Sequence, residues 1–335
     1  MTSHPNLSSS ILSKPALQTA AVGLLAALAA TSLINHYLAR KAEQANPPKG
    51  KFIEIDGVLL HYVESGHGDP LVLLHGNGSM IQDFGSSGLI NLTAKHNRVI
   101  TFDRPGYGHS ERPRSIIWTA QAQAKLLHRA LEELGVSNAV VLGHSWGASV
   151  AVELALNYPD FVRALVLASG YYYPTVRADV ALLSGPAIPV IGDLMRYTIS
   201  PIISRMIWPL AMRKIFGPLS VPKKFEQFPR EMAVRPSQIR SSAAEAALMI
   251  PNAIAACERY GDLKMPVVII AGEEDRLIDI NDQSARLHED IPQSTMHRLR
   301  GQGHMIHQTA TDFVMSAINE AIGSKPGRQR AVRAA

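Results

Sequence analysis

The sequence has almost no cysteine, since Cys257 is the only one in 335 residues. A single cysteine excludes an internal disulfide framework, and no cysteine pair or Cys/His array has the spacing of a zinc site. Cys257 falls in a stretch that we expect to be helical, where a free cysteine usually serves as a small buried apolar residue. We therefore expect neither a disulfide nor a metal site.

Charged and aromatic residues are also sparse, at 18% and 6%, whereas 46% of the residues are hydrophobic. This composition supports a sizeable core, and the length allows one large or two ordinary domains. The net charge of +5 does not indicate a nucleic-acid partner, because the basic residues are scattered and partly confined to the ends. Residues 323–335 read as a disordered basic tail that aids solubility or touches anionic lipid.

One segment near the N-terminus lacks charge altogether, between Lys14 and Arg40. Within it, residues 16–34 are long enough as a helix to cross about 30 Å of hydrocarbon. A membrane anchor, a cleaved signal peptide and a helix packed on the protein all fit such a run. We favour an anchor over residues 16–38, preceded by a tail over residues 1–15.

Residues 39–50 read as a linker, because they end in Asn46-Pro47-Pro48-Lys49-Gly50. More basic residues follow the apolar run than precede it. Because positive charges flanking a membrane span tend to lie on the cytoplasmic side, this favours a cytoplasmic catalytic domain, with a secreted or periplasmic one as the alternative. The residues concerned are Arg40, Lys41, Lys49 and Lys51.

From residue 51 onward, short buried strands alternate with helical stretches. Apolar runs such as LVLLHG, AVVLGHS and VVIIAG predict strands buried on both faces, and this alternation predicts an α/β fold with a mostly parallel sheet and helices on both faces. The pattern breaks over residues 170–258, where prolines divide the chain into short helices. We interpret this region as a helical cap over the active-site edge of the sheet, and residues 51–169 and 259–322 as the core.

The sequence Gly143-His144-Ser145-Trp146-Gly147 matches the pattern G-x-S-x-G. The pattern alone is weak, because it arises by chance in roughly one chain in ten of this length. Its setting is informative: a strand leads into it and a helix leads out, as a nucleophile elbow requires. We therefore predict that Ser145 is a nucleophile.

A serine hydroxyl needs a base to remove its proton, and the base needs an acid to orient it. His304 lies on a loop after the last expected strand and is the predicted base; His307, one helical turn on, is an alternative. Asp275 follows the preceding strand and is the predicted orienting acid, with Glu274 as the alternative.

Two backbone N–H groups should stabilise the oxyanion. Trp146, directly after the serine, is one predicted donor, and Asn77, in the glycine-rich loop after LVLLHG, is the other. His75 and His144 flank the predicted site, and we expect both to make structural hydrogen bonds.

Five motifs together make the chain resemble the α/β-hydrolase family from about residue 51 to residue 322. They are His75-Gly76-Asn77-Gly78, the segment from Asp103 to Ser110, the G-x-S-x-G sequence, Gly272 to Asp275, and Gly301-Gln302-Gly303-His304. The likeness is greatest to the branch that holds esterases, haloperoxidase-like enzymes without cofactors, and carbon–carbon bond hydrolases. Epoxide hydrolases and haloalkane dehalogenases are similar but use aspartate where this chain has Ser145.

This resemblance implies a serine hydrolase without a cofactor that acts on a small or medium hydrophobic ester-like substrate. A carbon–carbon bond hydrolase of a vinylogous diketone, using the same three residues, is one alternative. A ligand-binding protein that kept the residues but turns over slowly is another, because a fold does not fix a function.

Overall fold

The computed structural model describes residues 14–323 apart from 177–179 and 181–182. The expected basic tail lies outside the described residues except for Gly323, and the expected N-terminal tail does so except for Lys14 and Pro15.

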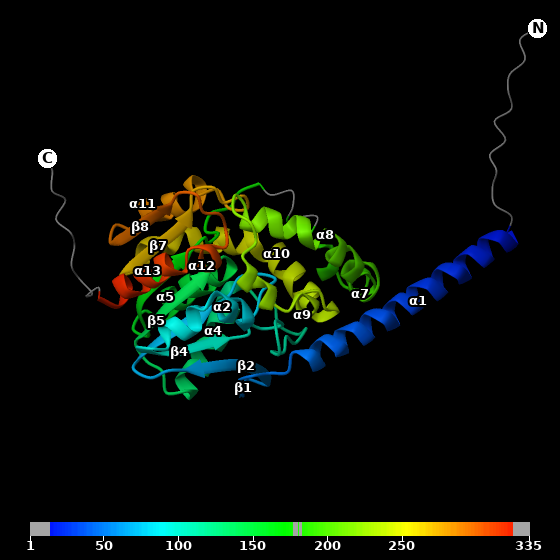
Figure 1. The fold of residues 1–335 in the computed structure, drawn as a ribbon, viewed down its shortest axis with the longest axis horizontal. Helices are drawn as coiled ribbons and strands as arrows, with labels where there is room; N and C mark the ends of the chain where they lie inside the picture. The colour runs from blue at the N-terminus through cyan, green and yellow to red at the C-terminus, as the bar shows by residue number, and fades with distance from the viewer. Residues whose placement is uncertain (1–13, 177–179, 181–182, 324–335) are drawn as a thin grey trace, which may run out of the picture.

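One eight-stranded sheet forms the centre of the molecule, with the strand order β1-β2-β4-β3-β5-β6-β7-β8 (Figure 1). The first two strands pair antiparallel, β2 also runs antiparallel to β4, and all other neighbours are parallel. The predicted mostly parallel sheet is therefore confirmed. The strands are β1 (Lys51–Ile55), β2 (Val58–Ser65), β3 (Asp69–Leu74), β4 (Asn97–Phe102), β5 (Ala139–His144), β6 (Val162–Ala168), β7 (Val267–Gly272) and β8 (Ser294–Leu299).

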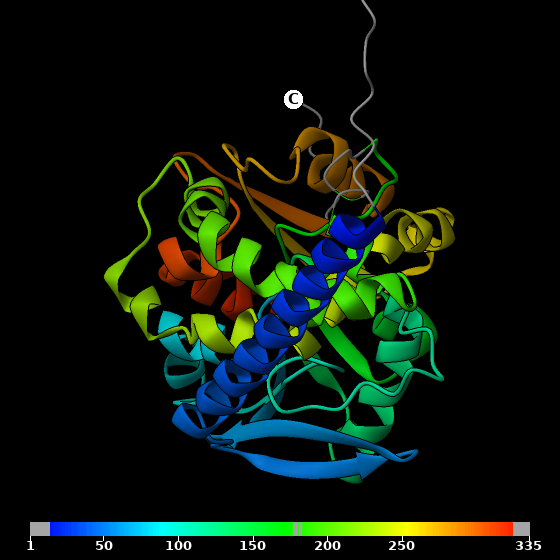
Figure 2. The same cartoon turned by 90° about the vertical axis from the view of Figure 1, so that its right-hand side faces the viewer.

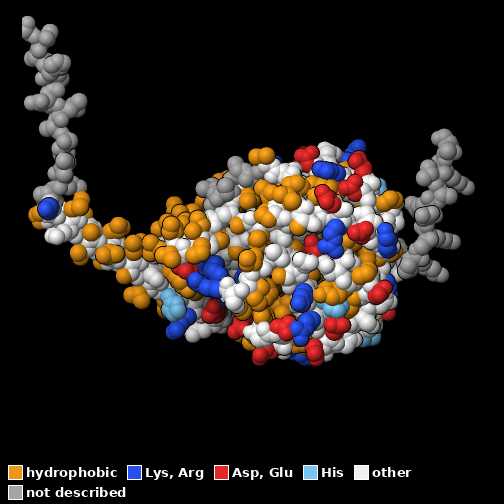
Figure 3. Space-filling model, turned by 180° about the vertical axis from the view of Figure 1, so that it is seen from behind, with side chains coloured by type: hydrophobic (Ala, Val, Ile, Leu, Met, Phe, Trp, Pro, Cys, Tyr) orange, Lys and Arg blue, Asp and Glu red, His pale blue; other side chains and the backbone are white. Residues whose placement is uncertain are grey.

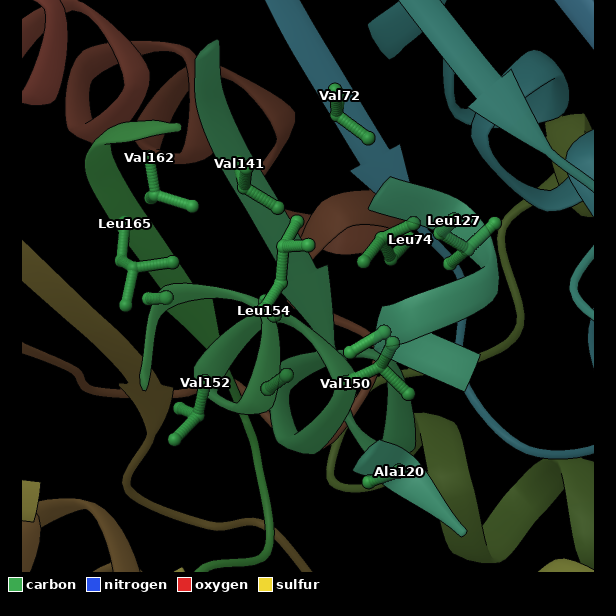
Figure 4. Packing of buried hydrophobic residues seen from close by; sticks show 14 of the residues in the cluster. Val72, Leu74, Ala120, Leu127, Val141, Val150, Val152, Leu154, Val162 and Leu165 are labelled. Carbon is green, nitrogen blue, oxygen red and sulfur yellow. The ribbon is translucent and has the colours of Figure 1, made fainter. Parts of the chain in front are cut away.

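Helices cover both faces of the sheet, as its sequence pattern predicts. Successive residues of β5 alternate between two cores: Val141 packs against α4 (Ala120–Glu133) and α5 (Trp146–Asn157), whereas its neighbours Val140 and Leu142 face the opposite cluster. Figure 4 shows Leu154 and Val150 of α5 packed among the strand side chains of the first core. Helices α2 (Ile81–Ser87), α3 (Leu89–Thr93) and α13 (Thr311–Gly323) cover the second.

Two separate helices follow the last strand. Helix α12 (Ile306–Thr309) ends before α13 begins at Thr311. Side chains of α12 bind Asp83 on α2: His307 Nε2 lies 2.9 Å and Gln308 Nε2 2.8 Å from Asp83 Oδ1. These bonds fix the direction of α12 separately from that of α13.

The cap is helical, but two of its helices are longer than the prolines predicted. Helices α8 (Ile199–Phe216) and α10 (Pro236–Ala256) run for 18 and 21 residues through Pro209 and Pro251. An internal proline removes one backbone hydrogen bond and bends a helix without having to end it when packing holds both halves. The other cap elements are η1 (Gly185–Ala187), α7 (Ile191–Tyr197), η2 (Lys223–Gln227), α9 (Arg230–Ala233) and η3 (Cys257–Asp262); η4 (Asn281–Ala285) and α11 (Arg286–Asp290) lie between β7 and β8.

The N-terminal helix α1 (Lys14–Ala45) projects from the body of the protein (Figures 1 and 2). Its most apolar 18-residue window has a mean hydropathy of 1.8 and no buried residue, so it is long and apolar enough to cross a membrane. The helix continues through Ala45, so that residues 39–45 are helical where we expected a linker. Contacts to the cap support this second half: Asn35 Nδ2 donates to the carbonyl of Thr198 at 2.7 Å, and Glu43 pairs with Arg235 at 2.6 Å.

Candidate active site

Ser145 occupies the sharp turn between β5 and α5. Its backbone adopts φ 54° and ψ −121°, which is uncommon for a residue other than glycine and is typical of a nucleophile elbow. Gly143 and Gly147 allow this turn because neighbouring backbone lies too close to them to leave room for a side chain. A Cβ added to Gly147 would lie 2.2 Å from the carbonyl oxygen of Leu74, and one added to Gly143 would lie 2.3 Å from that of Gly147.

His304 and Asp275 meet beside this elbow. His304 Nδ1 lies 2.7 Å from Asp275 Oδ2, and both side chains are almost fully buried. A carboxylate can only accept a hydrogen bond, so Nδ1 carries the proton and Nε2 keeps the lone pair that a general base needs. Asp275 is itself held by the backbone N–H groups of Leu277 and Ile278, at 2.8 and 3.1 Å from its Oδ1.

The alternatives considered from the sequence lie elsewhere. Asp275, not Glu274, binds His304 Nδ1, and the backbone N–H of Glu274 donates to the carbonyl of Gln302. His307 is fully buried, and its Nε2 is bound to Asp83. Asp275 is therefore the carboxylate that binds His304, and of His304 and His307 it is His304 that lines the cavity beside Ser145.

Ser145 and His304 line the same cavity, which has a volume of about 1320 Å³. Ser145 Oγ makes no hydrogen bond to any residue that the structure describes, and such catalytic contacts often tighten only when substrate binds. The cap supplies most of the wall, through side chains that are mainly apolar, among them Ile207, Trp208, Leu210, Met212 and Phe228. The cavity can therefore hold an apolar group of considerable size next to the serine.

The two predicted oxyanion donors have free N–H groups. Among the described residues, the backbone N–H of neither Asn77 nor Trp146 has a hydrogen-bond acceptor. The Asn77 side chain is fixed by Ser242 of α10: its Nδ2 donates to the Ser242 carbonyl at 3.0 Å, and its Oδ1 accepts from the Ser242 hydroxyl. A cap helix thus holds the loop that would supply one donor.

A buried ionic network joins the core to the same cap helix. Arg104 and Glu245 are both fully buried and form a paired contact through both guanidinium Nη atoms. Tyr107 Oη donates to Glu245 at 2.7 Å, and Arg104 Nε donates to the carbonyl of His75 at 2.7 Å. Sequence reasoning missed this network, because α10 contributes Glu245 from 141 residues away.

His75 and His144 make structural hydrogen bonds. Burial, followed by the charge of Arg104, lowers the pKa of His75 from 6.5 to about 4. Its Nδ1 donates to the carbonyl of Gly76 at 2.8 Å, while Nε2 accepts from the Arg104 backbone at 3.0 Å. His144 Nε2 donates to the backbone carbonyl of His304 at 3.0 Å, which ties the elbow to the loop of the predicted base.

Asp83, His144 and His307 form a second buried cluster, which no sequence motif predicts. One donor atom from each lies within 4.8 Å of the others, and imidazole with carboxylate is a donor set that binds zinc. Each residue also has a hydrogen-bond partner: His307 and Ser79 bind Asp83, and His144 binds the His304 carbonyl. Burial alone would raise the pKa of Asp83, but the charge and hydrogen bond of His307 outweigh it and hold that pKa below its ordinary value.

A serine at an elbow, a histidine–carboxylate pair and a helical cap over a mostly parallel sheet define one class of protein, the α/β hydrolases. The chain belongs to this class: the family model described as "alpha/beta hydrolase fold" matches residues 69–311.

Curated relatives are similar over most of the chain. An uncharacterized hydrolase of Bacillus subtilis (strain 168), YugF, is 25% identical over 281 residues, which cover 80% of this chain and 96% of that protein. A 2-hydroxy-6-oxononadienedioate/2-hydroxy-6-oxononatrienedioate hydrolase of Paraburkholderia phymatum is 27% identical over 266 residues, covering 73% of this chain and 84% of that protein.

Among solved structures, a membrane phospholipase A described as a novel bacterial virulence factor shares the fold, with a TM-score of 0.64 and 17% identity. That likeness covers 92% of this chain and 97% of the other, so it extends into α1. Other relatives and structural neighbours are haloalkane dehalogenases, an epoxide hydrolase and an esterase. The chain is therefore a hydrolase of the α/β fold, in a family that includes several kinds of reaction.

Proposed function

We propose that this protein is a serine hydrolase that cleaves a hydrophobic ester-like substrate through an acyl-enzyme, with Ser145 as nucleophile, His304 as general base and Asp275 as its orienting acid. The observation that carries the proposal is the 2.7 Å bond from His304 Nδ1 to Asp275, on the wall of the cavity that Ser145 enters. Ser145 stands where the related dehalogenases and epoxide hydrolases use aspartate, which favours acyl transfer.

The reaction has two half-steps. His304 Nε2 takes the proton of the Ser145 hydroxyl as Oγ attacks the carbonyl carbon, and the N–H groups of Asn77 and Trp146 bind the oxyanion. Collapse of this intermediate expels the alcohol, which takes the proton from His304 and leaves an acyl group on Ser145. A water molecule, deprotonated by His304, then attacks that acyl group; the bond to Ser145 Oγ breaks, Oγ takes the proton back from His304, and the acid is released.

The apolar parts of the molecule support a lipophilic substrate and a membrane location. The cap lines the cavity with apolar side chains and also exposes Ile202, Met206 and Leu210 of α8 to solvent. Figure 3 shows that hydrophobic side chains run from α1 onto the adjoining cap surface. We propose that α1 anchors the protein, with the catalytic domain on the cytoplasmic side because Arg40 and Lys41 follow the apolar stretch. The structural likeness to a membrane phospholipase A supports the anchor, whereas the side on which the catalytic domain lies rests on the flanking charges alone.

Carbon–carbon bond hydrolysis is the second candidate, because the sequence motifs also resemble those of carbon–carbon bond hydrolases and a curated relative at 27% identity is a 2-hydroxy-6-oxononadienedioate/2-hydroxy-6-oxononatrienedioate hydrolase. The same three side chains would serve it, with a vinylogous diketone in place of the ester.

A substrate panel distinguishes the two candidates. The purified full-length protein in detergent is assayed with acyl esters of increasing chain length and with a vinylogous diketone, beside a Ser145→Ala variant. The proposal predicts ester cleavage that increases from short to medium acyl chains and disappears in the variant. Turnover of the diketone alone would replace the proposal by the second candidate, and equal turnover by both proteins would contradict a serine nucleophile.

A further inference from the structure

Four arginines line a second cavity, of about 450 Å³, that shares no lining residue with the catalytic one. Arg112 and Arg114 come from the loop that follows β4, Arg196 from α7, and Arg240 from α10. Three separate segments, two of them in the cap, therefore bring positive charge to one place.

The anionic groups nearby do not neutralise these charges. Asp193 binds both Arg114, at 2.7 and 2.8 Å, and Arg196, at 2.8 Å. Arg112 lies 3.8 Å from Glu245, which is already paired with Arg104. Glu111 is the one acidic residue on the cavity wall within the described part of the chain, and its side chain accepts a hydrogen bond from the backbone N–H of Leu59.

Arg240 is the arginine without a partner. Among the described residues it makes no hydrogen bond and no ion pair, although it is only partly exposed. Burial lowers its pKa, and the charges of Arg114, Arg196 and Arg112 lower it further, so the cavity is a place where positive charges repel one another. Arg112 and Arg196 are nearly buried, with side chains 5% and 7% exposed, so water screens this repulsion poorly.

The cavity also offers neutral hydrogen-bond donors. Ser237 lines it from the first turn of α10, where the backbone N–H groups of a helix start are free and favour an anion. Ser241 lines it one turn further on, with its hydroxyl donating to the Ser237 carbonyl at 3.1 Å. Each guanidinium group can donate two parallel hydrogen bonds to two oxygens of a phosphate group. Several converging arginines match the double negative charge of a phosphate better than the single charge of a carboxylate.

The position of the cavity relative to α1 indicates a source for such an anion. Asn35 of α1 donates to the carbonyls of Tyr197 and Thr198, at 3.0 and 2.7 Å, directly after Arg196. The 21 residues of α1 before Asn35 would span about 30 Å, the thickness of a bilayer's hydrocarbon layer. In a membrane, Arg196 would then lie at the level of the lipid headgroups, and Figure 3 shows basic side chains gathered beside the base of α1.

We propose that the cavity formed by Arg112, Arg114, Arg196 and Arg240 binds a phosphate group, either that of an anionic lipid or that of a free phosphate ester. Binding requires neither Ser145 nor turnover, and only the lipid source rests on the proposed membrane anchor. The site is distinct from the catalytic cavity. A lack of phosphate binding would therefore not count against the proposed hydrolase activity, and a lack of hydrolysis would not count against phosphate binding.

The test uses the full-length protein with Ser145→Ala, so that no lipid is consumed, in a neutral detergent. Binding of inorganic phosphate and of glycerol phosphate is measured by calorimetry, and binding of phosphatidic acid by native mass spectrometry, with diacylglycerol as the lipid that lacks phosphate. Arg240→Gln and Arg114→Gln are compared with Arg129→Gln, a matched loss of one exposed arginine that pairs with Asp56 on the core. Thermal melting of each variant shows whether it is folded.

We expect one phosphate group to bind per chain, and Arg240→Gln to weaken binding by about tenfold, as loss of a charged hydrogen bond does. Arg114→Gln should weaken it as well, and Arg129→Gln should bind as the parent does. Binding of phosphatidic acid without binding of the soluble phosphates identifies a lipid headgroup as the ligand, and the reverse identifies a soluble phosphate ester. Absence of binding by all three, or equal weakening by Arg129→Gln, would overturn the proposal.

Discussion

Arg104 of the core and Glu245 of the cap helix α10 form an ion pair in which both side chains are fully buried. Gln123 and Tyr107 complete its hydrogen bonds, at 2.7 Å from Arg104 Nη1 and from Glu245 Oε2 respectively. Because α10 is held to the core in this way, and also binds Asn77, this helix forms a fixed part of the candidate active site. A cap opening would have to take place in other cap elements.

Breaking this pair should destabilise the protein strongly. Glu245→Gln leaves Arg104 buried without its countercharge, which typically costs about 3–5 kcal/mol of unfolding free energy. Chemical denaturation of the two proteins measures the difference. Glu231→Gln is the control, since Glu231 pairs with Arg205 and Arg230 on the cap surface, where exposed pairs contribute about 0–1 kcal/mol. A similar small loss in both variants would show that the buried pair does not hold the cap.

The position of the oxyanion loop should depend on Ser242. Ser242→Ala removes the hydroxyl that binds Asn77 Oδ1 but keeps the backbone carbonyl that binds Asn77 Nδ2. We expect kcat to fall about 3–10-fold with little change in KM, a fraction of the loss seen when a donor is removed outright. Steady-state kinetics on an ester, beside Ser316→Ala on the exposed face of α13, measure it. A change in KM alone would place Ser242 in substrate binding instead.

The fold could be read from the sequence because its signals are local. The continuous apolar strands and the elbow around Ser145 are each encoded within a few consecutive residues, and the sheet follows from their order along the chain. The cap could be recognised from the loss of that alternation. Its helices were predicted too short, since the packing that carries α8 and α10 through Pro209 and Pro251 is tertiary.

The candidate site, like the fold, was predictable only where the signal is local in the sequence. Motif order pointed to Ser145, Asp275 and His304, because each follows a recognisable strand. Nothing in the sequence connects Asp83 with His307, which are 224 residues apart, or Arg104 with Glu245. Such buried polar contacts depend on which side chains the finished fold brings together, and a single sequence carries no periodic signal for them.

Stability should fall in mild acid because of His75. Its pKa is about 4 in the folded protein and 6.5 when unperturbed, so the unfolded chain binds more protons between these values. Lowering the pH through this window therefore favours unfolding, by about 1.4 kcal/mol per pH unit for a single fully shifted group. Denaturation at several pH values should show that slope, and His75→Asn should reduce it. An unchanged slope in a folded His75→Asn protein would assign the acid sensitivity to other groups.

Membrane attachment should depend on the first half of α1 alone. Deletion of residues 1–34 keeps Asn35 and Glu43, which bind the cap, and removes the exposed apolar stretch. We expect the shortened protein to move from the membrane fraction to the soluble fraction and to remain folded. The mass of the full-length protein purified from cells provides the control: a chain shortened near residue 30 would indicate a cleaved signal peptide rather than an anchor.

The central claim is that Ser145 forms a covalent acyl-enzyme with the help of His304 and Asp275. The most direct measurement is labelling by a fluorophosphonate, with the adduct mapped by mass spectrometry, in the parent protein and in Ser145→Ala, His304→Ala, Asp275→Asn and Glu274→Gln. The account predicts one adduct, on Ser145, in the parent and in Glu274→Gln, and slow or absent labelling in the other three. An adduct on another residue, or full labelling of His304→Ala, would contradict it.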